Sequence, residues 1–140
     1  DDYDFQIGKA KQIKKGKKIA ILATGTSVGE SKKAAEKLNE IGISCSVYNF
    51  HTVKPIDIEY LEKIAIEYEL IFTVEEHNII GGLGSAVSET LVQKKIKPLQ
   101  FFLGIPDTYK NTGSYLEILE KSGISSEAIY RKISEKVRSL

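Results

Sequence analysis

The chain has 140 residues, of which 41% are hydrophobic and 28% are charged, and its formal net charge is +1. This length predicts one domain with an ordinary hydrophobic core, and the balanced charge argues against a nucleic-acid-binding protein. No apolar run is long enough to cross a bilayer, so no membrane span is predicted. The single cysteine, Cys45, cannot form an intrachain disulfide and is typical of a reducing compartment, which indicates a cytoplasmic protein.

The 140 residues contain no methionine. We therefore expect that the sequence is not a complete reading frame and that a start methionine, a tag or whole domains precede it. Residues 1–14 are interpreted as the end of an interdomain linker, with an edge strand near Ala10–Ile13. Residues 15–140 are interpreted as the domain itself.

The first regular elements alternate between strand and helix patterns. Ile19–Thr24 is a continuous apolar run, typical of a strand that is covered on both faces. Ser27 and Glu30 have the spacing of a helix capping box, and Gly42 is a suitable residue to follow the helix end. In the next segment, 43–47, apolar residues alternate with serines, so we expect a strand that is apolar on one face only.

The second half continues the alternation. Residues 58–68 have helical spacing, Leu70–Val74 reads as a buried strand, and a third helix follows over 86–91. Leu99–Ile105 is predicted as a strand that ends at Pro106. Two further helices are indicated, the first by a capping box at Ser114 and Glu117 with Gly123 as its stop, and the last by apolar residues at Ile129, Ile133, Val137 and Leu140.

This order of elements predicts an α/β fold. Strands that alternate with helices favour right-handed crossovers and a mostly parallel sheet between two helix layers. We therefore expect a three-layer α/β/α domain with about five strands, one of them an antiparallel edge strand. Ligands of such sheets bind at the carboxyl ends of the strands, where this chain has Gly25–Ser27, Phe50–His51, Glu75–His77 and Pro106–Asp107.

Glu75, Glu76 and His77 form the sharpest candidate group at that edge. They could act as an acid/base cluster, or bind a metal together with His51. Neighbouring residues of an extended chain point in opposite directions, however, so the three can converge only if the backbone turns. The two histidines lack a metal-ligand spacing, so no metal site is predicted. A strand-end carboxylate that caps a helix or pairs with a lysine such as Lys54 is the favoured interpretation.

The glycine-rich loop after these residues is the second candidate. Gly82 and Gly84 fit the first two positions of the dinucleotide-binding motif, but Val87 stands where its third small residue is required. Gly81, Gly82, Gly84 and Ser85 could still present a helix N-terminus to an anion, which could be a ligand phosphate or the chain's own Glu75 or Glu76 carboxylate. The glycines could also allow close packing against another domain. An interface or internal capping is favoured over a ligand.

At this point the motifs resemble a known family. The segments "GKKIAILATGTSV", "VYNFHTVKPID", "TVEEHNIIGGLGSAVSETL" and "LGIPDTYKNTGSYLEILEKSGISSEAIYRKI" are similar, in this order, to the C-terminal domain of transketolase-type thiamine diphosphate enzymes. The resemblance covers nearly the whole chain from Gly8. The same domain type is also the C-terminal domain of deoxyxylulose-phosphate synthase and of the β subunit of 2-oxoacid dehydrogenases. The histidines at positions 51 and 77, however, make the chain more similar to transketolase, particularly to its short-subunit form.

The resemblance implies a fragment of a larger enzyme. It implies a parent transferase that moves a two-carbon ketol group between phosphorylated sugars, in the pentose phosphate pathway, with thiamine diphosphate and Mg²⁺ or Ca²⁺. In this family the cofactor is held between the preceding pyrimidine-type and diphosphate-type domains, so no catalytic, cofactor-binding or metal residue is expected in this chain. The implied roles of the domain are packing against those domains, assembly of a homodimer, and a regulatory ligand site that is not general to the family.

Overall fold

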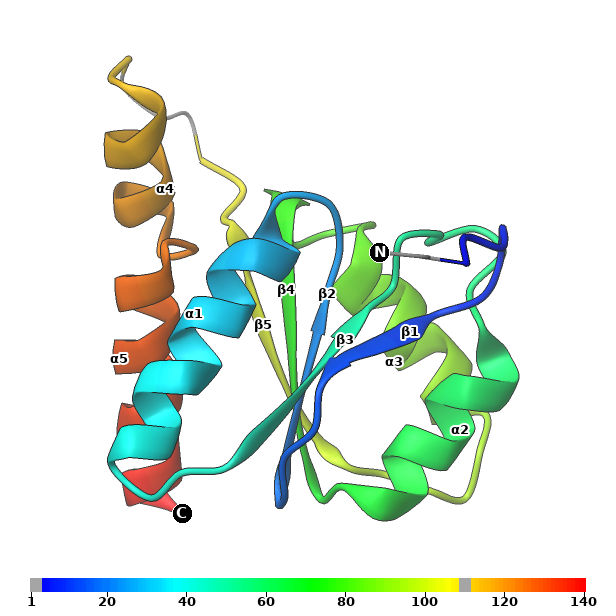
Figure 1. The fold of residues 1–140 in the computed structure, drawn as a ribbon. Coiled ribbons are helices and arrows are strands. Elements are labelled where there is room, and N and C mark those ends of the chain that lie inside the picture. Colours follow the sequence, from blue (N-terminus) through cyan, green and yellow to red (C-terminus); the bar gives the residue numbers. More distant parts are fainter. Residues whose placement is uncertain (1–3, 109–111) are drawn as a thin grey trace.

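The computed structural model describes residues 4–108 and 112–140 and contains one five-stranded sheet (Figure 1). The strand order is β1-β3-β2-β4-β5, in which β1 is antiparallel to β3 and all other neighbours are parallel. This confirms the expected mostly parallel sheet with an antiparallel edge strand. The strands are β1 (Lys11–Lys14), β2 (Ile19–Ala23), β3 (Cys45–Asn49), β4 (Leu70–Asn78) and β5 (Leu99–Ile105).

Helices cover both faces of the sheet, which gives the three layers (Figure 1). One face is covered by α1, α4 and α5, and the other by α2 and α3. The helices are α1 (Ser27–Glu40), α2 (Ile58–Glu67), α3 (Leu83–Val92), α4 (Tyr115–Ser122) and α5 (Ser126–Ser139). The predicted linker begins at Asp1–Tyr3, which lie outside the described residues.

The central strand β2 shows how the sequence builds the core. All five of its residues are buried, with Ile19, Ile21 and Ala23 in the cluster under α1 and α5, and Ala20 and Leu22 in the cluster under α2 and α3. Successive side chains of a strand point to opposite faces, so a strand between two helix layers must be apolar at every position. The prediction for this segment is confirmed.

The prediction for β3 was wrong. Ser46 was expected on a solvent face, but it is completely buried. Its hydroxyl accepts a hydrogen bond from the backbone N–H of Gly16 (2.7 Å) and lies 2.8 Å from the Tyr68 hydroxyl. A serine fits a buried strand when its hydroxyl finds partners in this way, and the alternation of the sequence could not reveal those partners.

One of the two capping boxes is present. In α4 the Ser114 side chain accepts from the Glu117 backbone, and Glu117 reaches back to Ser114, as predicted. The box expected at Ser27 and Glu30 is absent, because the N-cap residue of α1 is Thr26, so Ser27 is the first residue of the helix, where it is buried. Glu30 instead accepts a hydrogen bond from the backbone N–H of Ser126 at the start of α5 (2.8 Å).

Strand β4 is longer than predicted and continues through Asn78. Its register with β5 shifts between Val74 and Asn78. Such an irregularity bends a strand and redirects its side chains. The extension places Glu75, Glu76 and His77 at the edge of the sheet where the candidate site was predicted, with Glu75 buried and the other two exposed.

Candidate functional site

Glu75 is the buried centre of the predicted edge. Its side chain is only 2% exposed and points toward the start of α3. One carboxylate oxygen accepts from the backbone N–H of Leu83 (2.7 Å), and the other accepts from that of Gly84 (3.0 Å). The first N–H groups of a helix lack partners within the helix and attract negative charge, so Glu75 caps α3 from the neighbouring strand.

Glycines make room for this carboxylate. A Cβ atom on Gly82 would lie 1.7 Å from Glu75 Oε2, and one on Gly104 would lie 3.2 Å from Glu75 Cγ. A Cβ on Gly84 would lie 2.3 Å from the Phe102 ring. Gly81 has φ of +81° and its N–H donates to the Ser85 hydroxyl (2.8 Å). The glycines therefore bring the loop against β4 and β5, and the carboxylate occupies the place where an external anion would bind.

Glu76 points to the opposite face of the sheet. Its carboxylate accepts from the Thr26 hydroxyl, between β2 and α1, and from the Tyr115 hydroxyl at the start of α4 (2.9 Å). The two adjacent glutamates thus serve different helix layers, as the alternation of an extended chain requires. The loop Gly25–Ser27, which contains Thr26, was expected at this edge, but the pairing of Thr26 and Tyr115 with Glu76 was not predicted, because both residues are far from Glu76 along the chain.

The two histidines are not brought together with the glutamates as one group. His77 is exposed and its Nδ1 lies 2.9 Å from the backbone oxygen of Asn78. His51 packs against the Phe5 ring at 4.3 Å between centroids, and its Nδ1 lies 3.0 Å from the Thr52 hydroxyl. Within residues 4–108 and 112–140, no group of three or more His, Cys, Asp or Glu side chains could hold a metal ion.

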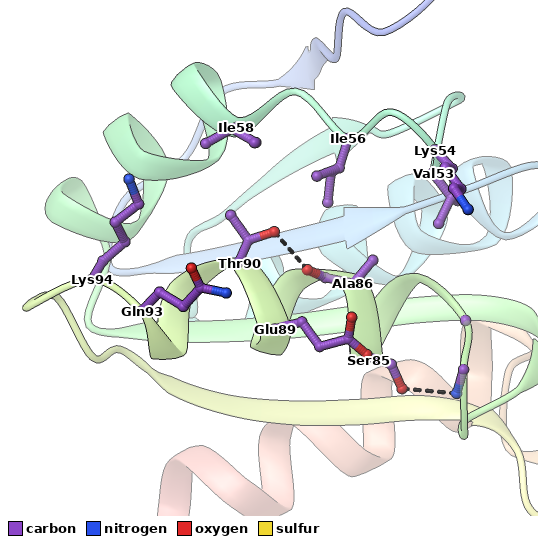
Figure 2. Close-up of a pocket in the computed structure, with 12 residues that line it drawn as sticks. Val53, Lys54, Ile56, Ile58, Ser85, Ala86, Glu89, Thr90, Gln93 and Lys94 are labelled. Atoms are coloured by element: carbon purple, nitrogen blue, oxygen red, sulfur yellow. Dashed lines mark hydrogen bonds between the residues drawn. The ribbon is translucent and has the colours of Figure 1, made fainter.

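A groove lies beside the glycine loop, between α3 and the segment that leads into α2 (Figure 2). Its volume is about 600 Å³. Ile56 and Ile58 project into it from one side, while Ser85, Glu89 and Gln93 line it from α3. Lys54, which was considered as a partner for a strand-end carboxylate, lines the far end of this groove. Its peptide bond to Pro55 is cis.

The only cysteine is not available as a nucleophile. Cys45 is completely buried in β3, and desolvation by burial raises the pKa of its thiol to about 12, opposed in part by the charge of Lys14. The thiolate is the reactive form, so at neutral pH this side chain is inert.

Glu75, the most buried carboxylate of the edge, already accepts two hydrogen bonds from the chain itself.

These features define the class of the protein. It is a three-layer α/β/α domain in which the carboxyl edge of the sheet is capped by the chain's own side chains. A helix N-terminus that Glu75 fills does not fit the diphosphate of thiamine diphosphate, and the described residues offer no set of carboxylates for its metal ion. The residues that the structure describes therefore do not fit that cofactor.

Comparison with known proteins identifies the family. The family model described as "Transketolase, C-terminal domain" matches residues 8–129, and the chain belongs to this family. It is 36% identical over 138 residues to a Methanocaldococcus jannaschii protein named "Putative transketolase C-terminal section", covering 99% of this chain and 43% of that protein. It is 39% identical over 132 residues to the 1-deoxy-D-xylulose-5-phosphate synthase of Histophilus somni (strain 2336), covering 94% of this chain and 21% of that enzyme.

The fold comparison agrees with the sequence. A solved structure titled "Split gene transketolase, inactive beta4 tetramer" superimposes with a TM-score of 0.86 at 31% identity, covering 96% of this chain and 43% of that one. The chain therefore spans less than half the length of the proteins it matches. Among the described residues, no helix is long and apolar enough to span a membrane.

Proposed function

We propose that this chain is the C-terminal domain of a transketolase-like enzyme that transfers a two-carbon ketol group between phosphorylated sugars. The parent enzyme uses thiamine diphosphate with Mg²⁺ or Ca²⁺, acts in the pentose phosphate pathway and is cytoplasmic. This domain serves packing against the preceding pyrimidine-type and diphosphate-type domains, homodimer assembly and regulation, and the chemistry takes place outside it.

The observation that carries this proposal is the hydrogen bonding of Glu75. The helix N-terminus that would suit a phosphate already holds a carboxylate 2.7 Å from Leu83 N and 3.0 Å from Gly84 N. When the N–H groups that could bind an anion already donate to a carboxylate of the same chain, their hydrogen bonds make the site rigid and leave it closed to ligand exchange. This supports an assembly role for the edge that includes Glu76, His77, His51 and the glycine loop.

Exposed apolar side chains near the same edge support the packing role. Ile80 is 67% exposed on the glycine loop, and Ile7 is 77% exposed on the segment before β1. Exposed apolar side chains stabilise an association when a partner removes them from water. We assign this edge to contact with the preceding domains of the parent.

The proposal is tested by titrating thiamine diphosphate with Mg²⁺ into the 140-residue chain in a calorimeter. No saturable heat is expected, because the chain lacks a fitting set of ligands. Saturable binding, or ketol transfer by the chain with nothing added, would contradict it. As a positive control, the parent enzyme with its preceding domains is expected to bind the cofactor under the same conditions.

Two other readings are distinguished by further assays. A deoxyxylulose-phosphate synthase parent, which the similarity to the Histophilus enzyme supports, or a 2-oxoacid dehydrogenase β subunit would use a donor other than the phosphorylated sugar that donates the ketol group to a transketolase. An anion- or nucleotide-binding regulatory module would bind inorganic phosphate near Gly82 and Ser85, with displacement of Glu75. Assaying the parent with each donor, and titrating phosphate into the chain, separates these readings.

A further inference from the structure

The segment before β1 has specific contacts with the rest of the domain. Residues 4–10 belong to the predicted end of an interdomain linker, and they run beside the loop 51–57, which leads from β3 into α2 (Figure 1). A flexible linker behaves as a random coil and takes no single course. The contacts of residues 4–10 therefore decide whether this segment is a flexible linker or a fixed one.

Two backbone N–H groups of the segment donate to side chains of the loop. The N–H of Gly8 donates to the Thr52 hydroxyl (3.0 Å), and the N–H of Ala10 donates to a carboxylate oxygen of Asp57 (3.0 Å). Both acceptors belong to the same loop, so the segment follows that loop from Gly8 to the start of β1.

A turn at Gly8 sets the direction in which the segment continues. The N–H of Lys9 donates to Gln6 O (3.1 Å), and Gly8 has φ of +79°, a conformation that glycine adopts readily. Before this turn, the Phe5 ring packs against the His51 ring with 4.3 Å between centroids. The loop therefore contacts the segment on both sides of the turn.

Asp57 joins the segment to the start of α2. Its side chain is only 6% exposed, and one oxygen caps α2 by accepting from the N–H of Tyr60 (3.2 Å). The other oxygen accepts from Ala10, and Lys9 Nζ lies 3.7 Å from the first. A buried carboxylate needs hydrogen-bond donors. Release of the segment would remove both Ala10 N–H and the Lys9 ammonium, so the buried charge opposes release.

We propose that residues 4–10 are a docked strap, held on the loop 51–57 by Asp57 and Thr52. The strap fixes the point and direction at which the preceding domains of the parent enzyme join this domain. The inference rests on the proposed function, which supplies those preceding domains, and it gives Asp57 the role of a positioning residue.

Hydrogen exchange of the unsubstituted chain tests the strap without any substitution. We expect the amides of Gly8 and Ala10 to exchange more slowly than those of an unstructured peptide by about tenfold or more, because exchange requires the strap to leave the loop. Exchange of both amides at the rate of an unstructured peptide would overturn the inference.

Asp57→Ser separates the strap from the helix cap. Serine caps a helix about as well as aspartate, but it has no second oxygen for Ala10. The Ala10 amide should exchange about tenfold faster or more, since a hydrogen bond to a carboxylate is lost, while the Tyr60 amide keeps its protection. An unchanged rate at Ala10 would overturn the role of Asp57.

Thr52→Val tests the strap without disturbing the buried carboxylate. It replaces the hydroxyl that accepts from Gly8 with a methyl group of similar size, so the Gly8 amide should exchange faster. Thr90→Val is the matched control, because the Thr90 hydroxyl donates to Ala86 O within α3. It should leave the Gly8 and Ala10 amides unchanged, and equal effects of the two valine variants would contradict a specific contact at Thr52.

Cleavage by trypsin after Lys9 provides a second readout, because a protease cuts a segment only when that segment opens locally. Cleavage there should be faster in Asp57→Ser than in the unsubstituted chain, and equal rates would argue against the strap. A flexible segment would leave the assignment of the domain intact, whereas saturable cofactor binding by the chain would contradict the proposed function whatever the strap does. The two failures are therefore distinguishable.

Discussion

At the scale of single residues, two adjacent glutamates have different tasks. Glu75 is buried and caps α3 on one face of the sheet, while Glu76 is exposed and joins the loop before α1 to α4 on the other. A pair that resembles an acid/base cluster in the sequence is divided by the alternation of the strand. Gly82 makes room for the Glu75 carboxylate because it lacks a Cβ, so this glycine is as important to the edge as the carboxylate itself.

Gly82→Ala is expected to destabilise the chain by about 1–3 kcal/mol. The backbone at Gly82 is extended (φ −95°), so an alanine is allowed there by its conformation. Its Cβ would nevertheless lie 1.7 Å from Glu75 Oε2 and displace the carboxylate from the N–H groups of Leu83 and Gly84. Urea unfolding measures the loss.

Gly29→Ala is the matched control for this substitution. Gly29 is exposed in α1, and a Cβ there would meet nothing within 4 Å. Alanine in a helix is favoured over glycine, so this variant should be more stable by roughly 0.5–1 kcal/mol. If Gly82→Ala were as stable as the unsubstituted chain, the capping of α3 by Glu75 would not require a glycine at position 82.

At the scale of elements, α1 and α5 are joined by Glu30. Its carboxylate accepts from the N–H of Ser126 (2.8 Å) and pairs with Lys33 (2.9 Å). Burial raises the pKa of this carboxyl, but the hydrogen bonds from Lys33 and Ser126 and the charge of Lys33 outweigh that effect and hold the pKa below its ordinary value of 4.5. The ionised form is therefore the one that the folded chain favours.

Because the pKa of Glu30 is lowered in the folded chain, the stability of the fold is predicted to depend on pH. A carboxyl whose pKa is lower in the folded state stabilises the fold above pH 4.5, and this contribution is lost as the pH falls through the folded pKa. Glu30→Gln should lower the free energy of unfolding by on the order of 1 kcal/mol at neutral pH. On acidification, this variant should lose less stability than the unsubstituted chain does.

Urea unfolding at neutral pH and below pH 4 measures both effects. Glu36→Gln, at an exposed glutamate of the same helix, is the control and should keep the full acid sensitivity of the unsubstituted chain. An equal loss on acidification in Glu30→Gln and the unsubstituted chain would show that Glu30 does not carry this dependence.

At the scale of the whole molecule, two surfaces have no partner in the described chain. The carboxyl edge of the sheet exposes Ile80 on the glycine loop, and the lateral edge exposes Leu99 and Phe102 on β5. The first is proposed to meet the preceding domains of the parent enzyme. A domain that spans less than half the length of its relatives is expected to have such surfaces.

Ile80→Asp tests the first surface. Because Ile80 is 67% exposed, its replacement should change the stability of the 140-residue chain by no more than about 0.5 kcal/mol. In the parent enzyme the same change would put a charge into an apolar contact, so the thermal stability and activity of the parent should fall. Ile66→Asp is the control and should leave both properties unchanged, and equal effects of the two variants would argue against a contact at Ile80.

The order of elements, the three-layer α/β/α class and the family could be predicted from the amino-acid sequence alone. These follow from patterns within short segments, such as the apolar run Ile19–Thr24, the capping box of Ser114 with Glu117 and the motif sequences along the chain. They were predictable because a local pattern of apolar residues and turn residues selects a local conformation regardless of what lies across the fold.

The pairing of residues that are distant along the chain could be seen only in the folded structure. It showed that Ser46 is buried because Gly16 and Tyr68 satisfy its hydroxyl, and that Glu30 joins α1 to α5 instead of capping its own helix. It also showed which of two adjacent glutamates faces α3. Such pairings depend on the register of strands and the docking of helices, which bring together groups that no spacing along the chain connects.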